Sequence, residues 1–180
     1  KIPDIKPGSI LHRETNSYIY ANSLELPSTT HISIVDEYGN ALSMTSTIES
    51  SFGSRLMTNG GFLLNNELTD FSFQKEKKGK RVANNIEPNK RPRSSMAPTI
   101  IFKNDKPLFI IGSPGGSNII GYVVNSIIGL VDWKMNVQQA ASIPHGINKF
   151  GTFYLEKNSK ISLLKNQLEK KGSKGKLRNF

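Results

Sequence analysis

The sequence predicts a mixed α+β domain, and three observations predict it. Residues 30–48 carry two runs of partly alternating apolar and polar side chains around a turn, which is the pattern of a β-hairpin. Residues 99–111 hold a second pair of short apolar runs around a turn. Between Ile120 and Val131, apolar residues recur three and four positions apart, which indicates a helix with one buried face. Strand pairs followed by such a helix indicate an α+β fold.

Composition excludes several classes of function. The 180 residues fit one domain or most of one, and they include no cysteine, which excludes disulfides, cysteine nucleophiles and thiolate metal sites. No apolar run approaches the ~18 residues that a membrane span needs. The net charge of +10 suggests nucleic acid, but eight basic residues lie in the lysine-rich stretch 151–180 and others in the run 75–81. Because aromatic residues do not alternate with these charges, we expect solvated segments and no nucleic-acid partner.

The chain up to the first hairpin is predicted to be irregular. Prolines and a glycine interrupt any period in residues 1–28, and 16–20 form a short strand at most. The hairpin itself is predicted to have strands at 30–35 and 41–48, joined by turn residues at 36–40.

Two carboxylates and a serine pair stand out in the middle of the chain. A short apolar run leads into a polar segment that includes Glu67 and Asp70. This segment is either a turn capped by its own polar side chains or a socket in which the two carboxylates bind a cationic amino group. A basic linker, 72–93, follows, and Ser94 and Ser95 come directly after it. The serine pair is either an ordinary loop or a pair of hydroxyl donors for a carboxylate.

A glycine-rich segment joins the second hairpin to the helix. The hairpin strands, 99–102 and 107–111, are apolar enough to be buried on both faces. Gly115 and Gly116 then precede the helix, with Ser117 as its predicted N-cap. The backbone N–H groups of this segment either form a tight strand-to-helix turn or stabilise a developing negative charge. The spacing is not that of a phosphate-binding loop.

The last part of the chain is predicted to mix short elements. Residues 136–142 indicate a helix stopped by the next proline, 152–156 a strand, and 159–171 a helix with an apolar face. His145 is interpreted as a structural residue, and no closing element is predicted after Gly172.

Thr29 is the candidate nucleophile. If the Ser28–Thr29 bond is cut, Thr29 gains a free α-amine beside its own hydroxyl, and such an amine has a pKa near ~8. One residue then supplies both the nucleophile and the base. Thr47, at the far end of the hairpin, could orient the Thr29 hydroxyl. The alternative is that both threonines are only strand-favouring residues.

Six separated motifs, taken together, resemble those of one family. They run in order from about Ser28 to about Pro144: Thr29-Thr30-His31, Gly39-Asn40-Ala41, Thr45-x-Thr47, Leu64-Asn65-Asn66-Glu67-x-x-Asp70-Phe71-Ser72, Asn89-Lys90-Arg91-Pro92-x-Ser94-Ser95-Met96-x-Pro98-Thr99 and Gly112-Ser113-Pro114-Gly115-Gly116. With these motifs the chain resembles the small subunit of the γ-glutamyltranspeptidases, which are N-terminal-nucleophile hydrolases.

The resemblance implies an architecture and a maturation step. It implies a four-layer αββα sandwich, incomplete in this chain. Residues 1–28 would be the C-terminal tail of a large subunit, and 29–180 a C-terminally truncated catalytic small subunit. Both would come from one precursor that cuts itself between Ser28 and Thr29. The heterodimer would be periplasmic or extracellular, with its export signal outside this chain.

The resemblance also implies a reaction and its residues. Thr29 would attack glutathione or another γ-glutamyl compound, and the acyl group would pass to water or to an amino acid or peptide, without cofactor or metal. The implied roles are these: Thr47 hydrogen-bonds the Thr29 hydroxyl, Gly115 and Gly116 supply the oxyanion-hole N–H groups, Glu67 and Asp70 hold the α-ammonium, and Ser94 and Ser95 hold the α-carboxylate.

Two departures from the family pattern bear on the substrate. Glu49 stands where many members have Asn, and as a substrate-binding residue it would favour the ammonium side. The segment 73–87 is shorter than in members whose loop covers the pocket, which suggests an open site. An open site leaves a polymeric γ-glutamate or an acyl-amide as alternative substrates. A further alternative is an uncleaved, inactive fragment.

Overall fold

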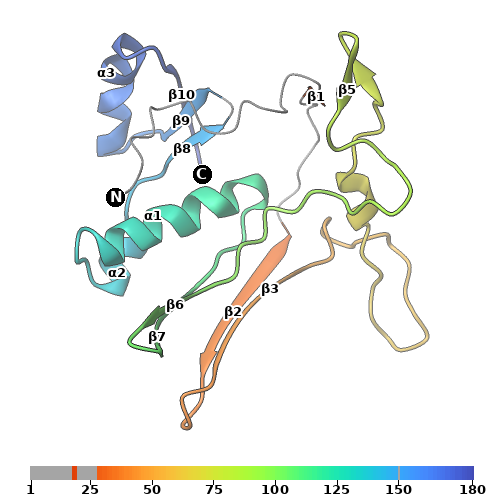
Figure 1. Ribbon diagram of the computed structural model, residues 1–180, viewed down its shortest axis with the longest axis horizontal. Helices are drawn as coiled ribbons and strands as arrows, with labels where there is room; N and C mark the ends of the chain where they lie inside the picture. The colour runs from red at the N-terminus through yellow and green to blue at the C-terminus, as the bar shows by residue number, and fades with distance from the viewer. Residues whose placement is uncertain (1–17, 20–27, 150) are drawn as a thin grey trace. The chain divides into compact units, whose positions relative to one another are not determined.

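The computed structural model describes residues 18–19, 28–149 and 151–180, which form two compact units (Figure 1). Unit 1 takes the described residues before 27 together with Ile48–Ser94, and unit 2 takes those after 27 up to Thr47 together with Ser95–Phe180. Most of the predicted large-subunit tail, 1–28, lies outside the described residues. Helices and strands occur together, as the α+β prediction requires.

The first hairpin of unit 2 is present as predicted. Strand β2 (Thr29–Val35) pairs antiparallel with β3 (Ala41–Thr47) along their whole length. The turn is fixed by the Asp36 carboxylate, which accepts hydrogen bonds from the backbone N–H groups of Tyr38 and Asn40. The hairpin therefore has one register, and that register places Thr29 opposite Thr47.

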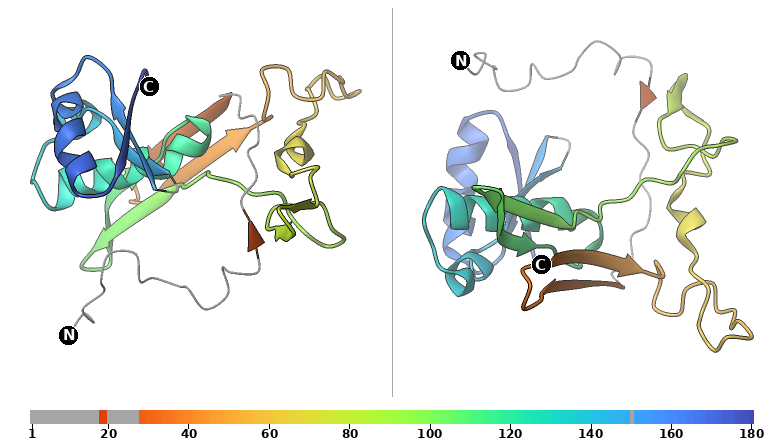
Figure 2. Two further views of the ribbon diagram at one scale, coloured as in Figure 1. Left: turned by 90° about the horizontal axis from the view of Figure 1, so that it is seen from above. Right: turned by 60° about the horizontal axis from the view of Figure 1, so that its bottom comes forward.

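The second hairpin lies beside the first (Figure 1 and Figure 2). Strands β6 (Thr99–Lys103) and β7 (Lys106–Ile111) pair antiparallel, with a register shift at Ile101/Phe102. The prediction that both faces of this hairpin are buried is wrong, because Phe102 is 59% exposed and Leu108 48% exposed. This hairpin is a two-stranded sheet, and the described residues cover these two side chains only in part.

Two helices follow the second hairpin. Helix α1 (Ile119–Val131) buries Ile119, Val123 and Leu130, and it packs on α2 (Val137–Ala141). A capping box on Asn136 starts α2 in the predicted place. The prediction of Ser117 as N-cap of the long helix is wrong, because the short 3₁₀ helix η3 (Gly116–Asn118) intervenes and Asn118 takes the N-cap position.

The end of unit 2 is more ordered than the sequence predicts. The sheet order is β10–β9–β8, formed by Lys174–Arg178, Thr152–Glu156 and Gly146–Lys149. Only β9 was predicted, and the parallel pairing of β10 with β9 corrects the expectation of no closing element. Between β9 and β10, the predicted helix is split into η4 (Lys160–Leu164) and α3 (Lys165–Lys170).

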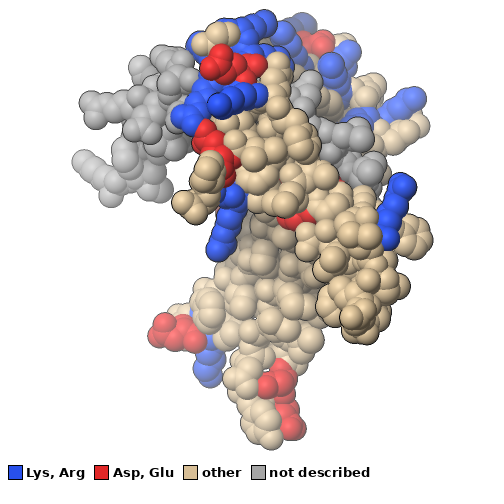
Figure 3. Space-filling model, turned by 90° about the vertical axis from the view of Figure 1, so that its right-hand side faces the viewer, with Lys and Arg blue, Asp and Glu red and all other residues tan. Residues whose placement is uncertain are grey.

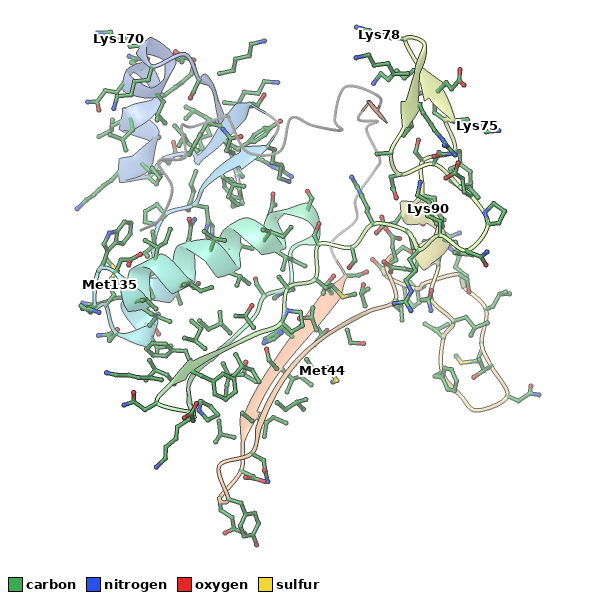
Figure 4. All side chains as sticks on the ribbon, in the orientation of Figure 1. Met44, Lys75, Lys78, Lys90, Met135 and Lys170 are labelled. Atoms are coloured by element: carbon green, nitrogen blue, oxygen red, sulfur yellow. The ribbon has the colours of Figure 1, made fainter. Side chains whose placement is uncertain are left out.

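Unit 1 is built from short elements around a few buried side chains. Its sheet has the order β1–β5–β4, from Tyr18–Ile19, Lys80–Val82 and Glu76–Lys77. The 3₁₀ helix η2 (Glu67–Asp70) carries the predicted carboxylates. The expected linker 72–93, whose side chains Figure 4 draws with Lys75, Lys78 and Lys90 labelled, is partly structured. Val82 and Asn85 are almost fully buried and anchor it.

Charged side chains are unevenly spread over the surface. On the face shown in Figure 3, most Lys and Arg side chains lie toward the top of the view, and Asp and Glu side chains mark its lower tip. Within the described ranges, no helix has the length and apolarity of a membrane span. The described residues also contain no group of three or more His, Asp or Glu side chains that could hold a metal ion.

Candidate active site

The candidate nucleophile heads a strand. Thr29 is the first residue of β2, directly opposite Thr47 of β3, and both are partly buried. Residues opposite each other in an antiparallel pair share a face, so the two side chains belong to the same side of the hairpin. The Thr47 hydroxyl donates to the carbonyl oxygen of Ser28 over 3.5 Å. The carbonyl of the predicted scissile bond therefore faces a hydroxyl donor.

The same face of the hairpin is polar from the Thr29–Thr47 pair as far as the Ser33–Ser43 pair. Below the Thr29–Thr47 pair, His31 lies opposite Thr45, and Ser33 lies opposite Ser43. The Ser33 and Ser43 hydroxyls donate to the Ile110 and Ile111 carbonyl oxygens at the end of β7. The polar face of the first hairpin therefore meets the strand that leads into the glycine-rich segment.

The glycine-rich segment holds a conformation that requires glycine. Gly115 has φ +133° and Gly116 has φ +55°, both in the region that side-chain-bearing residues rarely adopt. A Cβ on Gly115 would lie 2.6 Å from the ring of Tyr122 in α1. Next in the chain, the Ser117 hydroxyl receives a hydrogen bond from the Lys149 ammonium. Backbone N–H groups just before a 13-residue helix can stabilise a developing anion.

The predicted carboxylates gather in unit 1. The Asn66 side chain donates to Glu49 Oε2 over 2.8 Å and to the Thr69 hydroxyl over 2.9 Å. Burial, followed by repulsion from Asp70 and Glu49, raises the pKa of the Glu67 carboxyl. The Asp70 and Glu49 carboxylates are thus close enough to Glu67 to repel its charge, an arrangement that a cationic group would relieve.

The side-chain amide of Asn84 connects the carboxylate segment to the residue before the serine pair. The Asn84 side chain donates to the Asp70 carbonyl oxygen over 2.6 Å, and its own oxygen accepts from the Arg93 backbone N–H over 3.1 Å. Ser94 follows Arg93 and ends unit 1, whereas Ser95 opens the second segment of unit 2. Asn84 therefore fixes the backbone at Asp70 and at Arg93, the residue before Ser94.

The predicted site residues fall into two groups. Unit 2 holds Thr29, Thr47, Gly115, Gly116 and Ser95, and unit 1 holds Glu49, Glu67, Asp70 and Ser94. Sequence reasoning did not single out Asn66, Asn84 or His31. Asn66 lies in an Asn-Asn pair directly before Glu67, which is the signal that could have suggested local hydrogen bonding, whereas Asn84 lies 14 residues after the Asp70 that it contacts.

His145 behaves as the structural residue that the sequence suggested. Its ring lies 4.3 Å from that of Tyr122, centroid to centroid, and its backbone N–H donates to Glu156 Oε2. Burial lowers its pKa, and the Glu156 carboxylate opposes that change. The partly buried ring thus packs against Tyr122 of α1.

Comparison with known proteins gives one family. The model of the family described as Gamma-glutamyltranspeptidase matches residues 4–180. The glutathione hydrolase proenzyme of Bacillus subtilis (strain 168) is 45% identical over 117 residues, which cover 64% of this chain and 19% of that protein. The glutathione hydrolase proenzyme of Escherichia coli (strain K12) is 37% identical over 147 residues, 78% of this chain and 23% of that protein. The chain spans about a fifth of the length of these curated relatives.

Solved structures agree with the sequence comparison. A γ-glutamyltranspeptidase mutant of Helicobacter pylori superposes with a TM-score of 0.71 at 41% identity, covering 83% of this chain and 84% of that one. The Bacillus anthracis transpeptidase enzyme CapD superposes with a TM-score of 0.59 at 30% identity, covering 83% and 78%.

Proposed function

The chain belongs to the gamma-glutamyltranspeptidase family, and we propose that it is the catalytic part of a γ-glutamyl hydrolase and transferase that cuts itself before Thr29. One observation carries the proposal. Thr29 begins β2 opposite Thr47, and the Thr47 hydroxyl donates to the Ser28 carbonyl oxygen. The bond to be cut is therefore followed by one hydroxyl and faced by another.

Self-cleavage uses both hydroxyls. Thr29 Oγ attacks the Ser28 carbonyl carbon, and the Thr47 hydroxyl stabilises the negative charge that develops on the Ser28 oxygen. As the C–N bond breaks, the hydroxyl proton ends on the Thr29 nitrogen, and Ser28 becomes an ester of Thr29 Oγ. Water hydrolyses this ester, which leaves a Ser28 carboxylate and a Thr29 with a free amine and a free hydroxyl.

Turnover repeats the same attack on a substrate. The freed amine takes the proton of Thr29 Oγ as the oxygen attacks the γ-glutamyl carbonyl carbon. The Gly115 and Gly116 N–H groups stabilise the oxyanion, and the leaving amine takes the proton. The γ-glutamyl ester on Thr29 is then attacked by water, or by the amine of an amino acid or peptide, which regenerates the hydroxyl.

Recognition of the donor rests on its zwitterionic end. Glu67 and Asp70 hold the α-ammonium. Glu49, which accepts a hydrogen bond from the Asn66 side chain, places a third negative charge near them. Ser94 and Ser95 hold the α-carboxylate. The raised pKa of Glu67 supports this assignment: burial raises it first and repulsion from Asp70 and Glu49 adds to it, and a bound ammonium would relieve that repulsion.

The rest of the precursor would supply the partner. Relatives that this chain matches over about a fifth of their length are named proenzymes. We expect a large subunit from the same precursor to complete the four-layer αββα sandwich around the two hairpins of unit 2. We also expect export to the periplasm or to the outside of the cell, which fractionation of cells that produce the complete precursor would test.

The test uses the complete precursor. Incubation should give a fragment that begins at Thr29, measured by intact mass, and the processed protein should release p-nitroaniline from γ-glutamyl-p-nitroanilide. Thr29→Ala should abolish both events. Thr30→Ala, at the next and exposed position, should leave both intact. Active protein in which Ser28 is still bonded to Thr29 would overturn the proposal.

The substrate assignment has its own measurement. Turnover of the anilide is compared with release of glutamate from poly-γ-glutamate and with hydrolysis of an acyl-amide. A strong preference for the polymer or the acyl-amide would replace glutathione-like donors with that class. Asp70→Ala should raise KM for the anilide and leave self-cleavage intact; loss of self-cleavage would make Asp70 a structural residue.

A further inference from the structure

The His31 ring is held between two hydroxyls on the polar face of the first hairpin. Its Nδ1 lies 2.8 Å from the Thr45 hydroxyl on the opposite strand, and its Nε2 lies 2.9 Å from the Ser33 hydroxyl two residues along β2. Both ring nitrogens therefore have partners, and the orientation of the ring in its plane is fixed.

The direction of these hydrogen bonds follows from the Ser33 hydroxyl. This hydroxyl donates its only proton to the Ile110 carbonyl oxygen over 3.3 Å, so it can only accept from the His31 ring. The proton of the neutral ring is then on Nε2, and Nδ1 accepts from the Thr45 hydroxyl. Burial lowers the pKa of His31, which agrees with a neutral ring.

The ring fills the space where Gly112 would carry a side chain. A Cβ built on Gly112 would lie within the His31 imidazole, nearest to Cε1. Gly112 directly follows β7 and begins the segment that ends at Gly115 and Gly116. The missing side chain lets the backbone of this segment lie against the ring. Thr29, the first residue of β2, lies two residues before His31 and on the same face of the strand.

From this packing we infer that His31 is a positioning residue, which fixes the start of the Gly112–Gly116 segment against the strand that carries Thr29. The inference rests on the proposed function, because it matters only if this segment stabilises the oxyanion that Thr29 generates. His31 itself takes no proton from substrate. It acts through the hydrogen bonds to Thr45 and Ser33 and through contact with Gly112.

The inference predicts which kinetic constant changes. Except for Ser95, the residues proposed to hold the zwitterionic end of the donor belong to unit 1, whereas His31 and Gly112 belong to unit 2 and contact none of them in the hydrogen bonds given above. His31→Ala in the complete precursor should therefore lower kcat for γ-glutamyl-p-nitroanilide, by about 10- to 100-fold for a displacement near 1 Å, and leave KM nearly unchanged. Ser46→Ala, exposed on the opposite face of β3, is the matched control and should behave as wild type.

A double-mutant cycle tests the contact itself. Gly112→Ala should be strongly damaging beside His31, because the new methyl would overlap the ring, and much less damaging in the His31→Ala background, where the ring is gone. His31→Gln, which can offer one donor and one acceptor, should recover part of kcat. The rate of self-cleavage is measured for every variant, so that a variant with slow processing still gives a result.

The outcomes separate the two claims. Strong coupling between His31 and Gly112, in kcat or in self-cleavage rate, supports the positioning role. A His31→Ala enzyme with wild-type kcat, or equal costs of Gly112→Ala in both backgrounds, overturns it. If His31→Ala fails to process and neither Gly112→Ala nor the glutamine variant restores processing, the role is also overturned. A wild-type protein without γ-glutamyl turnover would instead overturn the proposed function.

Discussion

The side-chain amide of Asn84 donates to the backbone carbonyl oxygen of Asp70 over 2.6 Å. The same side chain accepts from the Arg93 backbone N–H, and the Asn84 carbonyl accepts from the Ser72 N–H over 2.8 Å. A single residue thus holds the end of η2 and the residue before Ser94 in one arrangement. All three bonds end on backbone atoms and none on the side chains proposed to bind substrate, so their loss should act by displacing those side chains.

Asn84→Ala should weaken substrate binding more than chemistry. It removes the partners of a backbone carbonyl and a backbone N–H, a cost of about 1–3 kcal/mol for each buried group left unpaired. Because the lost bonds hold the backbone beside Asp70 and Ser94, we expect KM for γ-glutamyl-p-nitroanilide to rise, with kcat and self-cleavage near wild type. Asn59→Ala, an exposed asparagine of the same unit, is the control. An unchanged KM would show that Asn84 does not shape the site.

Glu67 should give the donor affinity a pH dependence. Its pKa is raised by burial and by the neighbouring Asp70 and Glu49 carboxylates. Only the ionised form attracts the α-ammonium, so KM should fall as pH rises through a window above the usual range of a glutamate. Glu67→Gln should raise KM and flatten this limb of the kcat/KM profile. A limb that persists in the variant would belong to another group.

The same raised pKa fixes the sign of a stability effect. Between the ordinary pKa of the unfolded chain and the raised pKa of the folded one, the folded state binds more protons. The contribution of Glu67 to stability is therefore full at low pH and is lost as pH rises through that window. Glu67→Gln should raise Tm at neutral pH relative to wild type, and a lower Tm there would contradict this account.

Gly115→Ala should impair the reaction far more than Gly172→Ala does. The residue has φ +133°, and an added Cβ would lie 2.6 Å from the Tyr122 ring. Displacing one oxyanion donor costs about 10²–10³ in kcat. Gly172→Ala is the matched control, because Gly172 also has a positive φ, +87°, but has open space around its Cα. Comparable kcat values in the two variants would remove Gly115 from its proposed role.

Thr47 variants should separate the hydroxyl from the volume of the side chain. Thr47→Val keeps the shape but cannot donate to the Ser28 carbonyl oxygen, so self-cleavage should slow by about 10²-fold or more on the scale of a lost oxyanion donor. Thr47→Ser keeps the donor and should cut much faster than the valine variant. Equal cutting rates, followed on denaturing gels, would mean that the contact seen in the uncut chain has no role.

Local patterns were enough to predict the elements that form within one stretch of chain. The β2–β3 hairpin, α1 and the capping box on Asn136 follow from alternation, helical spacing and turn residues. Strand β10 could not be found this way, because Lys174–Arg178 is mostly charged and is a strand only through parallel pairing with β9. The small β4–β5 hairpin was missed for the same reason, because its stability depends on the burial of Val82.

The site residues show the same division between what local sequence predicts and what depends on tertiary contacts. Residues with chemistry of their own, such as Thr29, Glu67 and Asp70, were recognisable from their type and motif. His31 and Asn84 act through partners distant in sequence, Gly112 and Asp70, and nothing near them in the chain indicates those partners. Such supporting contacts depend on tertiary packing, and they became visible only with the fold.

The contact between Thr47 and the Ser28 carbonyl has a consequence for timing. On the proposed chemistry, the Ser28 carbonyl takes the Thr47 hydroxyl and the Thr29 amine is still bound in a peptide, so an uncut precursor cannot turn over a donor. The Ser28–Thr29 bond is thus the first bond that Thr29 attacks. Water then hydrolyses the resulting ester and releases Ser28 as a carboxylate. Activation is thus a single, irreversible event for each molecule, and whatever delays the cut keeps the protein inactive.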